Sequence, residues 1–120
     1  MSEFTYLITE RKYLTKEQLE KLSYFCYSDG QIISCFENYK GKAILCLNDN
    51  FDIVGWSFLF EYPGDVQKTF YLWVGKKYRR LGIGKTLYGI AQKLNNNEEF
   101  TVSRHNLVAK KFYDSIKRSD

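Results

Sequence analysis

The residues from Arg79 to Lys85 have the types and spacing of an anion-binding turn. They read Arg79-Arg80-Leu81-Gly82-Ile83-Gly84-Lys85. Glycine lets a ligand approach the backbone closely, and the first N–H groups of a helix favour phosphate because they have no acceptor within the helix. All charged residues from Val66 to Asn97 are cations, which is unfavourable at a helix start unless an anion is bound there. The pattern therefore predicts a ligand with several phosphates.

A short strand and an amphipathic helix position this turn. Tyr71 to Val74 is an uninterrupted apolar run, as expected for a strand buried on both faces. After the turn, apolar residues recur every three or four positions until Asn95-Asn96-Asn97. This spacing predicts a helix that begins at about Gly82 and buries one stripe of side chains.

Two common phosphate-binding loops do not fit the turn. A Walker A loop needs glycine where the chain has Arg79, and a dinucleotide fingerprint starting at Gly82 needs glycine or alanine where it has Leu87. The remaining pattern, Arg79-x-x-Gly82-x-Gly84 between a buried strand and a helix, resembles the pyrophosphate-binding signature of the GNAT superfamily of N-acetyltransferases.

The resemblance implies that acetyl-CoA binds at this turn as a co-substrate. In the family, backbone N–H groups of the turn hold the pyrophosphate, which implies that role for the residues from Arg79 to Lys85. A backbone N–H of the preceding strand polarises the thioester carbonyl there, and alignment on the motif places it near Val74, with Trp73 beside it. The same strand is also typical of a plain core strand, and the two roles are compatible.

Four residues in the last part of the chain resemble the family's second signature. They are Asn106, Ala109, Phe112 and Tyr113. The resemblance implies that Asn106 contacts the pantetheine arm and that the Tyr113 hydroxyl lies near the sulfur as general acid. Without the resemblance, Asn106 is a helix N-cap, and Phe112 and Tyr113 lie on the apolar face of that helix. A tyrosine at helical spacing is usually a core residue.

The general base is not evident from the sequence. Many GNAT enzymes use a glutamate on the central strand, but the stretch from Lys68 to Tyr71 has none. Glu61, on the preceding predicted strand, is the candidate, acting directly or through water, with Asp65 behind it. Otherwise Glu61 is an exposed strand-end carboxylate, and water or the substrate alone removes the proton.

The other segments predict an α/β fold of about five strands. The segment Gln31–Gly41 reads as a short helix or a packed loop, so its structure is left open. Further strands are expected at 4–9, 43–47, 53–62 and 100–102, and further helices at 16–27 and from Asn106. This order resembles the GNAT order, which implies a mixed, largely antiparallel sheet flanked by helices.

The end of the sequence departs from the family pattern. GNAT members usually continue after the last helix into two more strands, whereas this sequence ends at Asp120. We therefore expect the acceptor side to be open, which would suit a protein substrate, or to be completed by a second subunit of a homodimer.

Composition restricts the other functional classes. The 120 residues are expected to form one domain, 1–120, and the net charge of +4 is concentrated near the turn, which favours a local anion site over a nucleic-acid surface. Cys26, Cys35 and Cys46 lack C-x-x-C spacing and His105 is the only histidine, so neither a disulfide framework nor a metal site is predicted. No apolar run reaches the ~18 residues of a membrane span, and we expect a cytoplasmic protein.

The resemblance predicts an N-acetyltransferase that moves acetyl from acetyl-CoA to a primary amine by direct attack in a ternary complex. The expected acceptors are a protein amine, a polyamine, an amino sugar and an antibiotic, and the sequence does not choose among them. Two alternatives stay open. One is a catalytically degenerate GNAT-fold binding or inhibitory module, and the other is a small nucleic-acid binder that uses the basic window and its aromatic residues.

Overall fold

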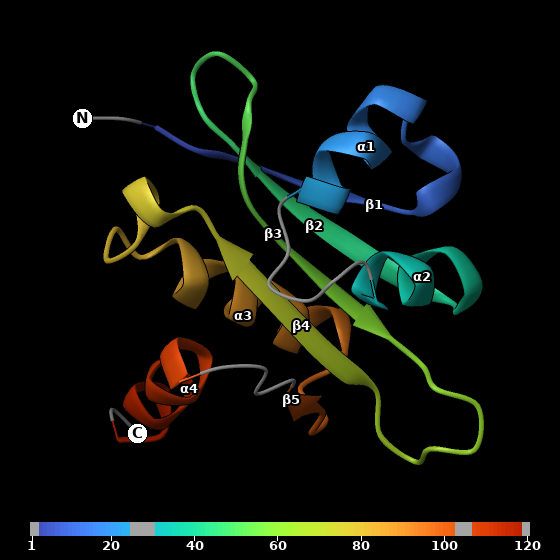
Figure 1. The fold of residues 1–120 in the computed structure, drawn as a ribbon. Coiled ribbons are helices and arrows are strands. Elements are labelled where there is room, and N and C mark those ends of the chain that lie inside the picture. Colours follow the sequence, from blue (N-terminus) through green and yellow to red (C-terminus); the bar gives the residue numbers. More distant parts are fainter. Residues whose placement is uncertain (1–2, 25–30, 103–106, 119–120) are drawn as a thin grey trace.

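The elements of the chain follow the predicted order. The structure is a computed structural model that describes residues 3–24, 31–102 and 107–118. In chain order the elements are β1 (Thr5–Thr9), η1 (Arg11–Tyr13), α1 (Lys16–Tyr24), α2 (Gln31–Asn38), β2 (Gly41–Leu47), β3 (Ile53–Phe60), β4 (Thr69–Val74), η2 (Lys76–Tyr78), α3 (Ile83–Leu94), β5 (Thr101–Val102) and α4 (Leu107–Arg118). Figure 1 shows this arrangement. None of the helices within these residues is long and apolar enough to cross a membrane.

One five-stranded sheet runs through the molecule in the order β1-β2-β3-β4-β5. The pairs from β1 to β4 are antiparallel, and β5 is parallel to β4. The predicted mixed, largely antiparallel sheet is therefore confirmed. Within the described residues, the β4–β5 pairing consists only of Thr69 with Thr101 and Phe70 with Val102. Within this part of the chain, β4 is therefore paired over a longer stretch with β3 than with β5.

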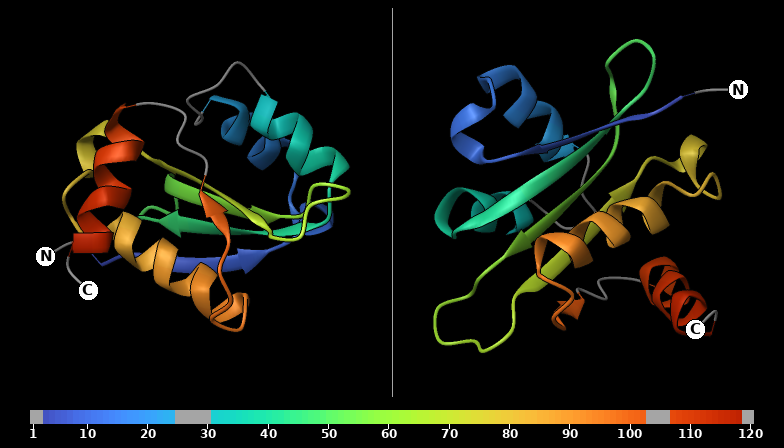
Figure 2. Two further views of the ribbon diagram at one scale, coloured as in Figure 1. Left: turned by 90° about the horizontal axis from the view of Figure 1, so that it is seen from below. Right: turned by 180° about the vertical axis from the view of Figure 1, so that it is seen from behind.

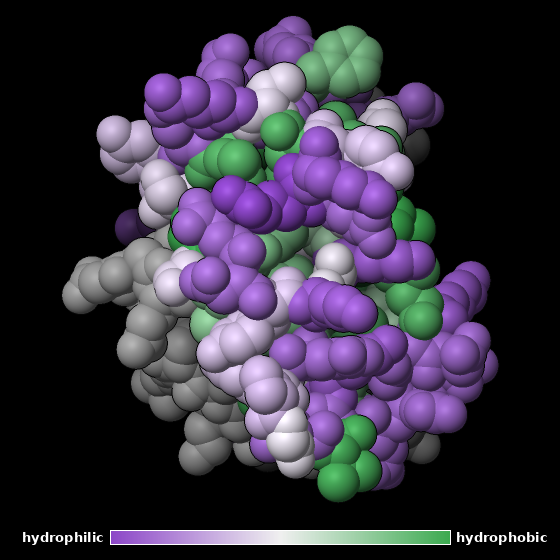
Figure 3. All heavy atoms as spheres, turned by 90° about the vertical axis from the view of Figure 1, so that its right-hand side faces the viewer, coloured by the Kyte–Doolittle hydropathy of each residue, from purple (hydrophilic) through white to green (hydrophobic). Residues whose placement is uncertain are grey.

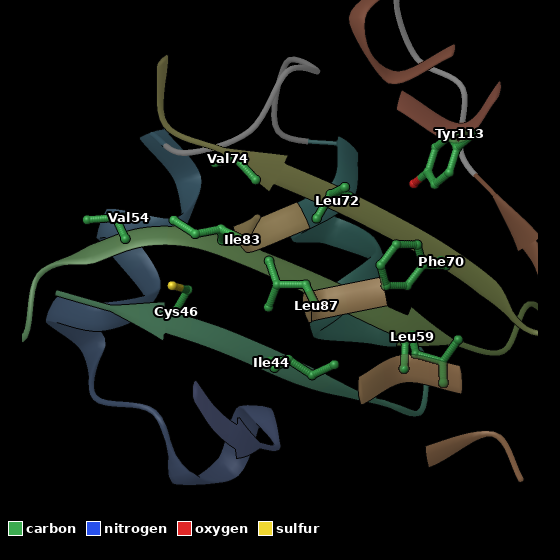
Figure 4. Packing of buried hydrophobic residues seen from close by; sticks show 11 residues of the cluster. Ile44, Cys46, Val54, Leu59, Phe70, Leu72, Val74, Ile83, Leu87 and Tyr113 are labelled. Carbon is green, nitrogen blue, oxygen red and sulfur yellow. The ribbon is translucent and has the colours of Figure 1, made fainter. Parts of the chain in front are cut away.

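Helices cover both faces of the sheet. α1 and α2 lie on one face, and α3 and α4 lie on the other (Figure 2, left). Side chains of successive strand residues enter opposite layers, so all eight residues of β3 are buried. The layer under α3 contains Ile44, Cys46, Val54, Phe70, Leu72, Val74 and Leu87 (Figure 4). The opposite layer contains Leu22, Phe36, Leu45, Trp56, Phe58, Phe60 and Tyr71.

Local sequence signals explain where several elements begin and end. A capping box begins α1, since the Thr15 N–H donates to Gln18 Oε1 (2.9 Å) and the Gln18 N–H donates to Thr15 Oγ1 (3.1 Å). α3 ends at Leu94, as the three asparagines predict, and the Asn95 Nδ2 donates to the Glu98 carbonyl (2.9 Å). The segment from Gln31, whose structure the sequence leaves undecided, forms a helix, α2. β4 begins at Thr69, two residues before the apolar run.

Candidate functional site

The predicted anion-binding turn has an open backbone at the N-terminus of α3. Gly82 is the N-cap of α3 and has φ 84°, in the left-handed region that favours glycine. A Cβ added at Gly82 would meet nothing within 4 Å. The first intrahelical bond runs from the Thr86 N–H to the Gly82 carbonyl (3.1 Å). The N–H groups of Ile83, Gly84 and Lys85 precede this bond, so helix geometry leaves them without an acceptor in the preceding turn.

Arg79 connects the turn to the end of β4. Its Nε donates a hydrogen bond to the Val74 carbonyl (3.2 Å), and its side chain is half-buried. η2 lies between them, closed by the bond from the Tyr78 N–H to the Gly75 carbonyl (2.8 Å). The Arg79 guanidinium therefore helps to hold the helix start against the strand. Arg80, Leu81 and Lys85 are exposed, so two of the predicted cations are accessible at the turn.

Near the end of β4, the backbone N–H and C=O groups of alternate residues point away from β3, to the side of the sheet on which β5 lies. The Gly75 N–H donates to the Val54 carbonyl on β3 (2.8 Å). Because these directions alternate along an antiparallel ladder, Leu72 and Val74 present their N–H and C=O groups to the β5 side. Trp73 has the opposite direction, since its backbone faces Trp56 on β3. Its half-buried ring packs in the layer with α1 and α2.

Ile83 and Gly84 hold the turn from beneath. The Ile83 side chain is buried in the layer between the sheet and α3. A Cβ added at Gly84 would lie 2.9 Å from Cε1 of Phe112 on α4 and 3.5 Å from Cδ2 of Leu72. Gly84 is therefore the contact point between α3 and α4. The sequence motif predicts a glycine here for a ligand, whereas the structure shows that packing alone also requires a small residue.

The two glycines of α3 should respond in opposite ways to the same substitution. Gly84→Leu is expected to displace Phe112 and to lower the free energy of unfolding by about 1–3 kcal/mol. Gly89→Leu is expected to raise it by up to about 1 kcal/mol, because nothing lies within 4 Å of a Cβ there and leucine favours a helix over glycine. Urea denaturation of both variants measures this. Equal changes of the same sign would contradict the packing role of Gly84.

Tyr113 lies beside Phe70, near the start of β4. It is 3% exposed, and its ring centroid is 6.4 Å from that of Phe70 and 6.2 Å from that of Tyr88. Figure 4 shows its hydroxyl directed toward the side of Leu72. The structure thus places Tyr113 in the buried layer between the sheet and α3. Asn106, the other residue of the second signature, lies outside the described residues.

Glu61 lies at the opposite end of β4 from Val74. It follows Phe60, which is opposite Thr69 at the start of β4. Thr69 is five residue steps from Val74, about 17 Å at ~3.3 Å per residue. The Glu61 side chain is 58% exposed, with its Oε1 4.0 Å from Lys68 Nζ. It lines a hollow of about 670 Å³ that the β3–β4 and α3–β5 connections also line. The structure therefore does not bring Glu61 to Val74.

Burial keeps several ionisable groups protonated. Burial raises the pKa of the Cys46 thiol and of the Tyr6 phenol. A hydrogen bond with Cys35, together with burial, raises the pKa of Tyr62 to about 12. At neutral pH the Cys46 thiol is therefore a poor nucleophile.

Within the described residues no group of three His, Cys, Asp or Glu side chains could hold a metal ion. Cys46 is buried and Cys35 half-buried, while Cys26 lies outside the described residues.

Sequence reasoning missed Thr86, which adds a second link to the turn. Its Oγ1 donates to the Gly82 carbonyl (3.0 Å), the same acceptor as its N–H. A threonine four residues after a helix N-cap is the sequence signal for this bond, since threonine hydroxyls commonly donate to the i−4 carbonyl. The Gly82 peptide is thus fixed by two donors.

The chain is similar to proteins of one family. The acetyltransferase (GNAT) family model matches residues 4–116. A search of curated protein sequences gave no significant match.

Several solved structures share the fold. An acetyltransferase of the GNAT family from Streptococcus pneumoniae TIGR4 is 21% identical, with a TM-score of 0.66 over 96% of this chain and 86% of that chain. An aminoglycoside N-acetyltransferase in complex with CoA is 14% identical, with a TM-score of 0.64 over 96% and 87%. A ribosomal-protein-alanine N-acetyltransferase from Brucella melitensis biovar Abortus 2308 is 14% identical, with a TM-score of 0.63 over 95% and 90%.

Proposed function

Because the chain belongs to the GNAT acetyltransferase family, we propose that it transfers an acetyl group from acetyl-CoA to a primary amine. The open N-terminus of α3 carries this proposal. Gly82 provides a left-handed N-cap with empty space in front of it, and the N–H groups of the next three residues follow. These features fit a pyrophosphate, which accepts hydrogen bonds from backbone N–H groups and is favoured by the helix dipole. Arg80 and Lys85 add exposed positive charge.

The edge of β4 is the proposed place of the reaction. The acetyl-CoA thioester supplies the acetyl group. The backbone groups of Leu72 and Val74 face the β5 side of β4, and we assign to an N–H near Val74 the stabilisation of the negative charge that develops on the thioester oxygen. Direct attack by the amine forms the C–N bond as the C–S bond breaks. The raised pKa of Cys46 agrees with a reaction that does not use this thiol.

Two proton transfers complete the proposed reaction. We assign the proton donor for the departing thiolate to Tyr113, which packs against Phe70 in the same buried layer as Leu72 and Val74. The position of Glu61 leads us to assign removal of the amine proton to water or to a basic substrate, rather than to this carboxylate. Trp73 contributes packing in the layer with α1 and α2. The contact of Asn106 with the pantetheine arm stays a prediction of the resemblance.

The acceptor is proposed only as a primary amine. Two of the similar structures carry names with different acceptors, an aminoglycoside and a ribosomal protein alanine, so similarity does not choose between a small molecule and a protein. A second subunit at the acceptor side and a cytoplasmic location stay predictions of the sequence. A module that binds CoA without turnover is the second candidate, and the distance of Glu61 from the turn favours it.

Thermal unfolding with acetyl-CoA tests the binding step. At one hundred times its Kd, a ligand that binds only the folded chain adds about 2.7 kcal/mol of stability, which corresponds to a rise in Tm on the order of 10 °C for a chain of this size. The comparison ligand is ADP, which carries a pyrophosphate but no thioester arm. No shift with acetyl-CoA would contradict the proposal. CoA release over a panel of amines then separates an acetyltransferase from a binding module.

A further inference from the structure

β1 is an outer edge of the sheet. It pairs with β2 on one side, and no described strand lies beyond it on the other. Figure 2 (right) shows β1 along this edge, on the opposite side of the sheet from β5. An open edge strand presents N–H and C=O groups that can pair with another strand.

The backbone groups on this open edge can be identified. The Glu61 N–H donates to the Lys40 carbonyl (3.0 Å) at the start of the β2–β3 ladder. Alternation then directs even-numbered residues of β2 toward β3 and odd-numbered residues toward β1. Leu45 is opposite Leu7, so Leu7 bonds to β2. Its neighbours Tyr6 and Ile8 therefore direct their N–H and C=O groups outward.

The edge is apolar and lacks the usual protection against pairing. Leu7 is 44% exposed and Ile8 is 47% exposed. They are the only exposed large apolar residues in the described strands. β1 contains no proline or charged residue, the devices that normally block edge pairing. By contrast, hydrophilic side chains cover most of the face in Figure 3, where apolar side chains form small separate groups.

We propose that two copies of this chain associate along β1, antiparallel, about a two-fold axis at Leu7. In this register Tyr6 of each copy is opposite Ile8 of the other. Each such pair exchanges two backbone hydrogen bonds, and an aromatic side chain faces a β-branched one. The two Leu7 side chains meet at the axis as a non-hydrogen-bonded pair, the geometry in which cross-strand side chains lie closest.

Charge and symmetry favour a second copy over an unrelated strand. In the register that pairs Tyr6 with Ile8, Glu3, which precedes β1 in one copy, lies at the same end of the pair as Arg11, the first residue of η1 in the other copy; both residues are exposed. Opposite charges at facing positions support one alignment over its neighbours. A two-fold contact needs one patch that is complementary to itself, and β1 with its flanking residues meets this requirement in backbone hydrogen bonding and in charge. The interface is at the opposite edge from β5, so it is independent of the proposed acetyl transfer.

Sedimentation equilibrium of the chain and two variants tests the association. Ile8→Pro removes an outward N–H without removing a bond to β2, and Ile8→Lys places a charge on the edge. We expect the unmodified chain to be a dimer and both variants to be monomers with unchanged circular dichroism. If proline disturbs folding, the lysine variant still gives the answer. A monomeric unmodified chain over the whole accessible concentration range, or an Ile8→Lys variant that dimerises equally well, would overturn the proposal.

Disulfide trapping tests the register. Leu7→Cys places two thiols at the axis, so mild oxidation is expected to give a covalent dimer. Thr5→Cys is the matched control, because Thr5 would be opposite Thr9 of the second copy and far from its own counterpart. The unmodified chain, with its native cysteines, sets the background on a non-reducing gel. No covalent dimer of the Leu7→Cys variant above that background would overturn the register.

Discussion

Gly82→Glu is expected to abolish the stabilisation of the chain by acetyl-CoA and to reduce acetyl transfer at least about 100-fold, the loss that removal of a well-placed anion contact produces at about 2.7 kcal/mol. The substitution places a carboxylate where the pyrophosphate is proposed to bind. The open space around Gly82 means that the new side chain meets no packed neighbour. The loss would therefore come from repulsion of the ligand and occupation of its place.

Gly64→Glu is the matched control for this variant. Gly64 has φ 89°, close to the 84° of Gly82, and a Cβ there also meets nothing within 4 Å. Both substitutions add the same charge and cost about 1 kcal/mol of backbone strain. We expect both variants to lose similar Tm without ligand, and only the Gly64 variant to keep its response to acetyl-CoA. Equal loss of the response in both, or retention in both, would contradict the proposed location of the site.

The site features that the sequence predicts are local ones. The turn and the start of α3 follow from glycine, charge and apolar spacing within a few residues, and the structure places the helix start one residue after Gly82. The sequence alone does not decide the structure of the segment that forms α2, because its apolar residues fit a helix or a loop. It is fixed by a distant contact, since the Phe36 ring packs against Trp56 and Phe58 at centroid distances of 6.0 and 4.8 Å.

The relations that sequence reasoning did not reach depend on register and on long-range packing. The β3–β4 register places Phe60 opposite Thr69, and this single fact separates Glu61 from the turn. The contact of Phe112 with Gly84 joins two helices that are distant in sequence. Neither contact has a short-range signal, because each is set by how whole elements pack.

The Tyr113 hydroxyl is expected to matter for turnover and not for folding. Tyr113→Phe keeps the ring that packs with Phe70 and Phe112, so we expect an unchanged Tm and an unchanged thermal response to acetyl-CoA. If the hydroxyl donates the proton to the departing thiolate, kcat should fall about 100-fold or more. Removing this proton donor affects the reaction step, so the KM for acetyl-CoA should stay within a small factor of its original value.

Tyr88→Phe is the control for Tyr113→Phe, because it removes a hydroxyl from the same aromatic group. The Tyr88 ring lies 5.6 Å from Phe70 and 6.2 Å from Tyr113, and its side chain is half-buried on α3. We expect kcat of this variant to be nearly unchanged. Steady-state CoA release at saturating amine and acetyl-CoA measures both variants. If kcat is unchanged in Tyr113→Phe, or falls equally in the two, Tyr113 is a packing residue and the thiolate takes its proton from water.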